Sequence, residues 1–268
     1  MTTPSRNPES AHQSDRVTSI LDQLAAKGSV SVDEVAREFS VSRATIRRDL
    51  RTLDEQNLLT RTHGGAVACD VAYELPVRYR NTRGRQQKMA IARAAVRTLP
   101  SGPYVVAVSG GTTTSEVARL LASRTELTVV TNALNIAMEL VTRPRVKLVV
   151  TGGVARLKSY ELVGPWAERT LGGINVGTAF VGVDGISAEA GISTHDEIEA
   201  HINAVMISRA RRVVVVADGS KVGRKLLAHV AALTAVDELI TDSGADPAEL
   251  DAVRDQGVRV TVADLPAR

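Results

Sequence analysis

Apolar residues near the start of the chain recur with the 3.6-residue period of α-helices. The first stretch ends near Gly28, and a second short helix follows, with Ser31 as its N-cap and Glu34 completing a capping box. After a break at Ser40, a third helix capped by Ser42 is predicted to end near residue 55. The apolar positions that face the core of these helices are Val17, Ile20, Leu21, Leu24, Val32, Val35, Ala36, Phe39, Ile46, Leu50 and Leu53.

A β-hairpin is predicted directly after the third helix. Residues 58–62 have the composition of a strand, 63–65 form a turn with two glycines, and 66–67 form the short return strand. Three short helices followed by a hairpin within about 55 residues are typical of a winged helix-turn-helix.

The rest of the chain alternates between valine-rich runs and helical stretches. Such runs, separated by helices, predict an α/β fold whose mostly parallel sheet is covered on both faces. The predicted strands are 104–109, 127–131, 146–151, 178–183, 212–217, 236–240 and 258–262. The predicted helices are 85–99, 113–123, 133–142, 159–171, 196–210 and 246–256.

These patterns divide the 268 residues into four segments. We expect a disordered tail over 1–15, a winged helix-turn-helix over 16–68, a linker over 69–89 and a second domain over 90–268. Charge changes this picture in one place: residues 69–90 carry a net charge of +3, while the segments before and after are each neutral. A global basic field therefore does not argue for nucleic acid, and any such argument depends on local clusters.

Composition excludes several classes of protein. Hydrophobic residues make up 44% of the chain and charged residues 24%, which is typical of a globular protein. The single cysteine, Cys69, excludes an internal disulfide and a cysteine-cluster metal site. No apolar run approaches the roughly 20 residues of a membrane span, and Met1 to Ser14 lacks the apolar segment of a signal peptide. We therefore expect a cytoplasmic protein that binds neither a metal ion nor a cofactor.

The third helix has a basic outer face. Ile46, Leu50 and Leu53 share one side, and at about 100° per residue Arg48 and Arg51 lie roughly 130–170° away from it. The N-terminal part of such a helix contacts base edges, and arginine binds guanine or phosphate. An alternative is that this face is merely solvated, and Asp49 is expected to pair with an arginine or to make a cap contact instead of contacting a base. The candidate DNA-binding residues, including the hairpin tip, are Ser42, Arg43, Thr45, Arg47, Arg48, Arg51, Arg61 and His63.

Two motifs in this region resemble a known family. The run V-S-R-A-T-I-R-R-D-L at 41–50, followed by R-T-H-G-G-A at 61–66, is similar to the DeoR family of bacterial transcriptional regulators. The resemblance covers roughly residues 16–265. It implies a regulator, usually a repressor, whose C-terminal domain senses a phosphorylated sugar or a related metabolite.

A glycine-rich loop follows the first strand of the second domain. Ser109, Gly110, Gly111, Thr112, Thr113 and Thr114 stand between that strand and the next helix. Backbone N–H groups and the helix dipole favour an anion at such a position. The alternative is an ordinary glycine turn with threonine caps.

Polar or glycine-rich residues also follow other strands of the sheet. Ligands bind outside the carboxyl ends of strands in open α/β sheets. The residues that directly follow the strands, here called strand exits, together predict a pocket. Lys221 would supply charge to a phosphate, and Asp184 or Asp218 would bind sugar hydroxyls. The alternative for Asp218 and Lys221 is a turn with a local ion pair. The further residues of this predicted site are Asn132, Gly152 and Gly153.

The second domain resembles the DeoR sensor domain, which is related in fold to ribose-5-phosphate isomerase. That resemblance implies that 110–114 is the phosphate loop and that Asp218 and Lys221 belong to an Asp-x-Ser-Lys motif. It also implies that Arg80 and Lys88 are basic linker positions that bear on the response to the effector. The chain departs from the family pattern at Ser109, where the family more often has Asp.

A sugar-phosphate isomerase is the alternative function. The isomerase relatives carry Asp-Gly-Ala-Asp and then Lys-Gly-Gly, whereas residues 184–187 lack the second Asp and 188–194 contain no lysine. Thr194 and Glu197 are expected to form a capping box. His195 and His201 are expected at the surface. We therefore expect a regulator and not an enzyme.

The winged module is small for a specific DNA interface, which predicts a symmetric dimer or tetramer. The expected partners are double-stranded operator DNA and a phosphorylated sugar of carbohydrate catabolism, whose binding releases the DNA.

Overall fold

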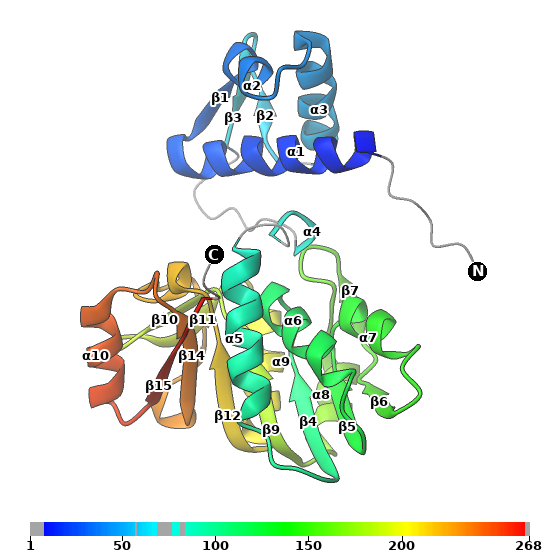
Figure 1. Cartoon of the computed structure of the whole chain (residues 1–268), viewed down its shortest axis with the longest axis vertical. Coiled ribbons are helices and arrows are strands. Elements are labelled where there is room, and N and C mark those ends of the chain that lie inside the picture. The colour runs from blue at the N-terminus through cyan, green and yellow to red at the C-terminus, as the bar shows by residue number, and fades with distance from the viewer. Residues whose placement is uncertain (1–7, 57, 69–76, 81–83, 266–268) are drawn as a thin grey trace. The chain divides into compact units, whose positions relative to one another are not determined.

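The computed structural model describes residues 8–56, 58–68, 77–80 and 84–265, which fall into two units (Figure 1). The first unit ends at Arg83 and the second begins at Gly84. Residues 85–89, predicted as the end of the linker, form the first turns of a helix in the second unit. The linker positions 69–76 and 81–83 lie outside the described residues.

In its described residues the first unit contains the three predicted helices, a small antiparallel sheet and a fourth, four-residue helix within the segment predicted as a linker. The short strands pair in the order β1-β3-β2, and β3 is central. Strand β1 is an addition to the predicted hairpin. The elements are α1 (Pro8–Lys27), β1 (Ser29–Ser31), α2 (Val32–Glu38), α3 (Arg43–Glu55), β2 (Thr60–Arg61), β3 (Gly65–Val67) and α4 (Val77–Arg80).

Helix α1 begins earlier than the sequence predicts. Residues 8–15 were expected in a disordered tail, but they form the first two turns of α1. Pro8 at the first position suits a helix start, where its missing N–H needs no partner. Gln13 Nε2 donates to Asp49 Oδ1 at 3.3 Å, which ties this extension to α3. The tail residues 1–7 lie outside the described part of the chain.

The turn between α2 and α3 fixes the angle at which the two helices meet. Ser40 adopts a left-handed backbone with φ of 53°, and Val41 N donates back to the Ala36 carbonyl at 3.0 Å. Ser42 then caps α3, and its Oγ accepts the N–H of Thr45. Ser31 caps α2 as predicted, through the N–H of Asp33.

The second unit is built on a seven-stranded sheet in which every pairing is parallel. The strand order is β15-β14-β12-β9-β4-β5-β6. All seven predicted strands belong to this sheet. They are β4 (Tyr104–Val108), β5 (Leu127–Thr131), β6 (Val146–Val150), β9 (Val176–Val181), β12 (Ala210–Val216), β14 (Glu238–Asp242) and β15 (Arg259–Ala263).

Helices cover both faces of this sheet, because successive valines point to opposite sides. On one face Val106 and Val214 pack with α5 (Arg85–Arg97), α6 (Thr112–Leu121) and α7 (Leu134–Leu140). On the other face Ala107 and Val215 pack with α8 (Pro165–Gly172), α9 (Glu197–Ser208) and α10 (Pro247–Asp255). Figure 1 shows α5 in front of the strands and α9 behind them.

Smaller elements follow several strands of the main sheet. β7 (Val154–Arg156) and β8 (Glu161–Val163) form an antiparallel hairpin. β10 (Gly185–Ser187), β11 (Gly191–Thr194) and β13 (Ala228–Ala231) form a three-stranded sheet. Two 3-10 turns, η1 (Gly219–Lys221) and η2 (Leu233–Ala235), complete the unit. Among the described residues, no helix has both the length and the apolar character needed to cross a membrane.

Two predicted elements are wrong in detail. The helix expected over 159–171 begins only at Pro165, because Gly164 with φ of 87° interrupts the chain and proline favours the first helical turn. The capping box expected from Thr194 and Glu197 does not form at the start of α9, which the structure describes. Its N-cap is Asp196, whose carboxylate accepts the N–H groups of the second and third residues of α9.

Candidate functional site

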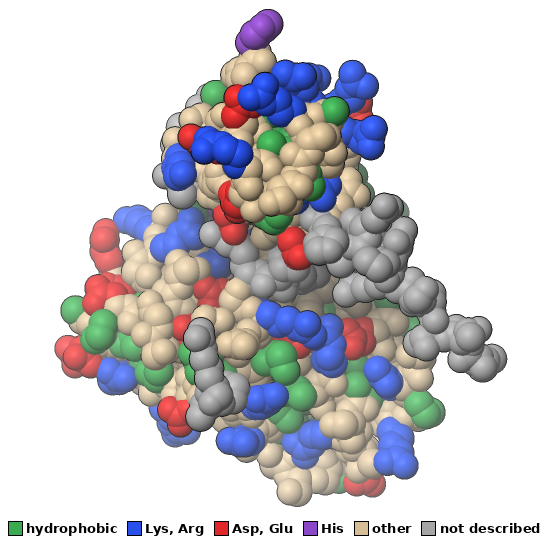
Figure 2. All heavy atoms as spheres, turned by 45° about the horizontal axis from the view of Figure 1, so that its top comes forward, with side chains coloured by type: hydrophobic (Ala, Val, Ile, Leu, Met, Phe, Trp, Pro, Cys, Tyr) green, Lys and Arg blue, Asp and Glu red, His purple; other side chains and the backbone are tan. Residues whose placement is uncertain are grey.

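The outer face of α3 is exposed and basic. Arg47, Arg48 and Arg51 are all exposed, while the opposite face of the helix is buried at Ile46 and Leu50. Figure 2 shows blue side chains gathered on the first unit, in the upper part of the view. Guanidinium groups in this position suit contact with phosphates and with guanine edges.

The other predicted residues at the start of α3 have structural contacts as well. Ser42 caps the helix, and its hydroxyl lies 2.9 Å from that of Thr45. Arg43 pairs with Asp33 of α2, with Nε 2.7 Å from Oδ1, although both side chains are more than half exposed. These contacts orient the first turn of α3 relative to α2.

Asp49 is the acidic exception on this basic helix. It is buried, and Arg16 Nε of α1 lies 2.8 Å from its Oδ2. The interpretation that Asp49 pairs with an arginine is therefore confirmed. The ion pair joins α1 to α3.

The wing is held by the pairing of β3 with β1 and by backbone hydrogen bonds of the turn between β2 and β3. Val32 N donates to the Gly64 carbonyl at 3.0 Å, and Thr62 N donates to the Gly65 carbonyl at 3.0 Å. A Cβ at Gly65 would lie 1.9 Å from the Val30 carbonyl oxygen, so only glycine fits. Arg61 and His63, the predicted wing residues, are exposed near this turn.

In the second unit, the parallel strands place their carboxyl ends at one edge. Residues that follow β4, β5, β6, β9 and β12 therefore meet there, as the sequence predicts. Thr151 N donates to the Thr131 carbonyl at 3.1 Å, which joins two of these exits directly. Gly182 N donates to Ser109 Oγ at 2.9 Å and joins two more.

The glycine-rich loop after β4 leads directly into α6. Gly111, the N-cap, has φ of 128°, a conformation that favours glycine, and no side chain caps the helix. Thr112 is partly exposed, whereas Thr113 and Thr114 are buried. Ser109 is completely buried, and its hydroxyl oxygen accepts the N–H of Gly182, the residue that follows β9.

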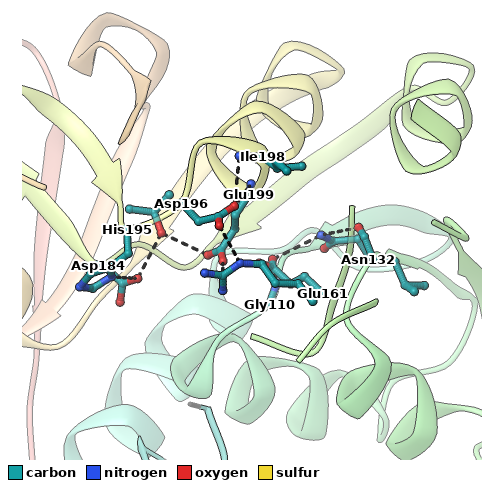
Figure 3. Close-up of polar contacts among 11 residues, drawn as sticks. Gly110, Asn132, Glu161, Asp184, His195, Asp196, Ile198 and Glu199 are labelled. Carbon is teal, nitrogen blue, oxygen red and sulfur yellow. Dashed lines mark hydrogen bonds and ion pairs between the residues drawn. The ribbon is translucent and has the colours of Figure 1, made fainter. Parts of the chain in front are cut away.

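A buried carboxyl group lies over this loop. Glu161, at the start of β8, accepts the Gly110 N–H at 2.8 Å and Asn132 Nδ2 at 3.3 Å through the same oxygen, Oε1 (Figure 3). Burial raises the pKa of Glu161, against the opposing effect of hydrogen bonds from Gly110, Glu199 and Asn132. The predicted residue Asn132 therefore belongs to the site, with its amide bound to a group that the sequence did not single out.

Glu161 connects the loop to a polar network around the start of α9. Thr194 Oγ1 lies 3.2 Å from both Glu199 Oε1 and Asp184 Oδ2. Arg156 of β7 bonds Glu199 at 3.3 Å and Asp196 at 3.0 Å. Burial raises the pKa of Asp196, but the N–H of Glu199 and the Arg156 guanidinium outweigh it and lower that pKa.

Asp184 is the centre of the other half of this network. Lys221 Nζ lies 3.1 Å from its Oδ1, and His195 Nδ1 lies 3.0 Å from its Oδ2 (Figure 3). The surface position expected for His195 is wrong, because its side chain is only 16% exposed. His201 is exposed as expected and pairs with Glu168.

Lys221 and Asp218 do not form the local ion pair that was the alternative interpretation. Asp218 instead caps η1, and its Oδ1 accepts the N–H and the hydroxyl of Ser220. Lys221 reaches across to Asp184, 37 residues away in sequence. Of Asp218 and Lys221, therefore, only Lys221 contacts the polar network around Asp184.

Lys88 lies at the amino-terminal end of α5 and is buried. Arg212, near the start of β12, donates to the Thr98 carbonyl at the other end of α5. The helix therefore runs antiparallel to the strands and brings Lys88 toward their carboxyl ends. Arg80 lies in α4 of the first unit.

The glycines after β6 provide a tight turn beside the loop. Gly152 and Gly153 have φ of 71° and 124°, and a Cβ at Gly153 would lie 2.7 Å from the Val163 carbonyl oxygen. These glycines let the β7–β8 hairpin fold back over the edge of the sheet. Their position explains how Glu161 reaches Gly110.

The residues that sequence reasoning missed are Glu161, Arg156, Glu199 and the role of His195. Glu161 fell inside a predicted helix, although the pair Gly164-Pro165 was a signal that the helix starts later. Glu199 and Arg156 carried no local signal, because their contact joins segments 43 residues apart.

A shallow hollow of about 500 Å³ lies at the opposite edge, where the strands begin. Burial raises the pKa of Tyr104 in it, but Thr178 and Arg211 outweigh that effect and lower the pKa. No predicted site residue lines this hollow. Its lining residues are Pro103, Tyr104, Val105, Glu126, Thr128, Asn175, Val176, Gly177 and Arg211.

Comparisons with known proteins match both units. A family model described as the DeoR-like helix-turn-helix domain matches residues 16–72, and one described as the DeoR C terminal sensor domain matches residues 83–243.

Curated relatives align over nearly the full chain. GlpR, an HTH-type transcriptional regulator of Haloferax volcanii, is 36% identical over 95% of this chain and 98% of its own length. YulB, an HTH-type transcriptional regulator of Bacillus subtilis, is 35% identical with the same coverage. The glycerol-3-phosphate regulon repressor of Escherichia coli K12 is 31% identical over 86% of this chain and 91% of its own.

Among solved structures, ribose 5-phosphate isomerase A of Methanocaldococcus jannaschii aligns with 52% of this chain and 53% of its own. The TM-score is 0.35 and the identity 18%, values at which neither activity nor ligand carries over.

Proposed function

Because the chain belongs to the DeoR family of transcriptional regulators, we propose that it represses a carbohydrate-catabolism operon and is released from the operator by a phosphorylated sugar. The observation that carries this proposal is the pairing of a basic, exposed helix α3 with a polar site at the carboxyl edge of a separate α/β unit. A cytoplasmic location follows from a role on DNA.

The proposed DNA contacts are those of the exposed face of α3 and of the wing. Arg47, Arg48 and Arg51 extend from the helix, and Arg61 and His63 are exposed on the wing. Ser42, Arg43 and Thr45 set the position of the first turn, where base contacts are made in helix-turn-helix proteins.

Footprinting on the DNA that flanks the chain's own coding sequence tests this assignment. We expect Arg47→Ala and Arg48→Ala each to weaken binding at least about fivefold, since one bidentate base contact contributes about 1–3 kcal/mol. A matched control is Arg254→Ala, which removes a guanidinium from an exposed ion pair on α10. Unchanged footprints for both α3 variants would contradict the assignment.

The proposed effector site comprises the glycine-rich loop and the neighbouring strand exits. The free N–H groups at the start of α6 and the charge of Lys221 favour a phosphate, and Asp184 has the acceptor atoms for sugar hydroxyls. Arg80 and Lys88 are proposed to affect the response. The residues assigned to the site are Ser109, Gly110, Gly111, Thr112, Thr113, Thr114, Asn132, Gly152, Gly153, Asp184, Asp218 and Lys221.

A thermal-shift screen of the full chain against phosphorylated sugars, with the unphosphorylated sugars as controls, tests this site. We expect at least one phosphorylated compound to raise the melting temperature while its unphosphorylated counterpart does not. Stabilisation by neither set would contradict the site.

We also infer a symmetric oligomer. A single winged module covers too little DNA for strong specificity, and paired modules read two half-sites. Exposed apolar side chains on the second unit, such as Trp166 at 68% and Met138 at 71%, are compatible with a subunit contact there. Light scattering on the purified chain gives the answer, and a monomer at micromolar concentration would contradict the inference.

The isomerase alternative keeps one observation in its favour, the cluster of Asp184, His195 and Lys221 beside buried carboxyl groups. The family relationship supports a regulator instead. Incubation of the chain with aldose and ketose phosphates separates the two, because measurable isomerisation would favour the enzyme.

A further inference from the structure

The loop that opens α6 already holds a carboxyl group of the chain itself. Glu161 is 1% exposed, and its Oε1 accepts the Gly110 N–H at 2.8 Å. A Cβ at Gly110 would lie 2.4 Å from Glu161 Cγ and 2.6 Å from its carboxyl carbon. The Glu161 side chain therefore lies directly on the loop, where an external anion would approach.

The loop nevertheless keeps donors that Glu161 does not use. No side chain caps α6, which has ten residues. Thr114 is fully buried, and its Oγ1 has no hydrogen-bond partner within the part of the chain that the structure describes. A Cβ at Gly111 would lie 3.1 Å from that hydroxyl, so the hydroxyl is directed at the loop. A buried hydroxyl without a partner is costly and indicates a ligand that would supply one.

We propose that the Glu161 carboxylate is an internal competitor for the effector's phosphate group, and that phosphate binding at the Gly110–Thr114 loop displaces it. This inference rests on the proposed function, because it concerns the same loop. It adds the residue that sets how strongly the loop binds an anion.

The charges around Glu161 favour competition over joint binding. The carboxyl of Glu199, on α9, faces Glu161, while the positive charge of Arg156 is bound to Glu199 and Asp196. Gly110, Asn132 and Ser159, its other partners, are neutral. A phosphate beside an ionised Glu161 would thus meet a like charge in a buried, low-dielectric site, where repulsion is strong.

The hairpin that carries Glu161 has a feature suited to displacement. Tyr160, the residue before it, has a left-handed backbone with φ of 60°, which is unfavourable for a non-glycine residue. Contacts with α7 hold this conformation, because Leu134 N donates to the Tyr160 carbonyl at 2.9 Å. Release of Glu161 would relax Tyr160 and shift the β7–β8 hairpin, whose Arg156 contacts the start of α9.

Calorimetric titration of the full chain with inorganic phosphate tests the proposal. We expect Glu161→Gln to bind phosphate at least about tenfold more tightly than the natural chain, because it removes the competing charge and keeps the shape. Glu161→Ala should behave in the same way. The matched control Glu168→Gln, which alters an exposed glutamate on α8, should leave the affinity unchanged.

A second arm varies the pH. Sulfate keeps its charge between pH 5.5 and 8, so its binding reports the protein's own titration. We expect sulfate to bind the natural chain more tightly as pH falls, and by a larger factor than it binds Glu161→Gln.

The outcomes separate this inference from the proposed function. Phosphate binding with equal affinity in the natural chain and in Glu161→Gln would overturn the competition and leave the loop as the effector site. Absence of phosphate binding from every variant would overturn both.

Discussion

Asp49 on α3 and Arg16 on α1 form a buried ion pair, with Arg16 Nε 2.8 Å from Asp49 Oδ2. The pair faces the core of the first unit, while the arginines on either side of Asp49 face solvent. One acidic residue thus fixes the helix in place, and the basic residues around it stay available for DNA.

This arrangement predicts a large difference between two aspartate substitutions. Asp49→Ala leaves the Arg16 guanidinium buried without its partner and should destabilise the first unit by about 3–5 kcal/mol. Asp33→Ala breaks the exposed pair with Arg43 and should cost no more than about 1 kcal/mol. Hydrogen exchange of amides in α1 and α3 measures both effects, and equal protection in the two variants would contradict the role of Asp49.

The wing provides a pair of glycines with different surroundings. Gly65→Ala places a Cβ 1.9 Å from the Val30 carbonyl oxygen, so β3 must move away from β1. Gly64→Ala has no atom within 4 Å of its new Cβ and is the control. We expect the first variant to lose DNA affinity at least about tenfold in fluorescence anisotropy, through displacement of Arg61 and His63, and the second to keep it. Equal affinities would show that the wing makes no important contact.

Lys221 and Lys225 form a second matched pair. Lys221 adjoins the loop network through Asp184, whereas Lys225 pairs with Glu189 at the surface. Lys221→Ala should reduce the thermal shift produced by a phosphorylated sugar and leave DNA affinity unchanged, while Lys225→Ala should alter neither. A normal ligand response in Lys221→Ala would place the pocket elsewhere.

The main sheet could be predicted from sequence because its central strands are largely buried on both faces. A continuous run such as 212–217 has no other stable location than the interior of a parallel sheet. The apolar period of α3 likewise predicts which arginines are exposed. In each case the pattern lies within one short segment.

The polar network could not be predicted in the same way. Glu161 reaches Gly110 only because the hairpin folds back at Gly152 and Gly153, a path that depends on contacts between distant segments. The same holds for His195, which is drawn into the site by Asp184. Local patterns show which residues are polar, but partners across 50 residues depend on the tertiary fold.

The raised pKa of Glu161 predicts a pH dependence of stability. Burial, the main cause, keeps the carboxyl protonated in the folded chain above the pH of about 4.3 at which an unfolded glutamate titrates. The contribution of this group is fully present below that pH and is lost as pH rises through the raised pKa. As pH rises from about 4.3, we expect the free energy of unfolding to fall less for Glu161→Gln than for the natural chain. Urea denaturation monitored by circular dichroism measures it. Parallel pH profiles would contradict this.

The central claim is that α3 binds the duplex and the second unit controls release through a small anion. Fluorescence anisotropy of the duplex flanking the chain's own coding sequence, at low salt and with phosphorylated sugars added in turn, tests it most directly. We expect the chain to bind this duplex, Arg47→Ala to bind it at least about fivefold more weakly, and one phosphorylated sugar to release the DNA. A chain that ignores the duplex, or stays bound in the presence of every sugar phosphate, would contradict it.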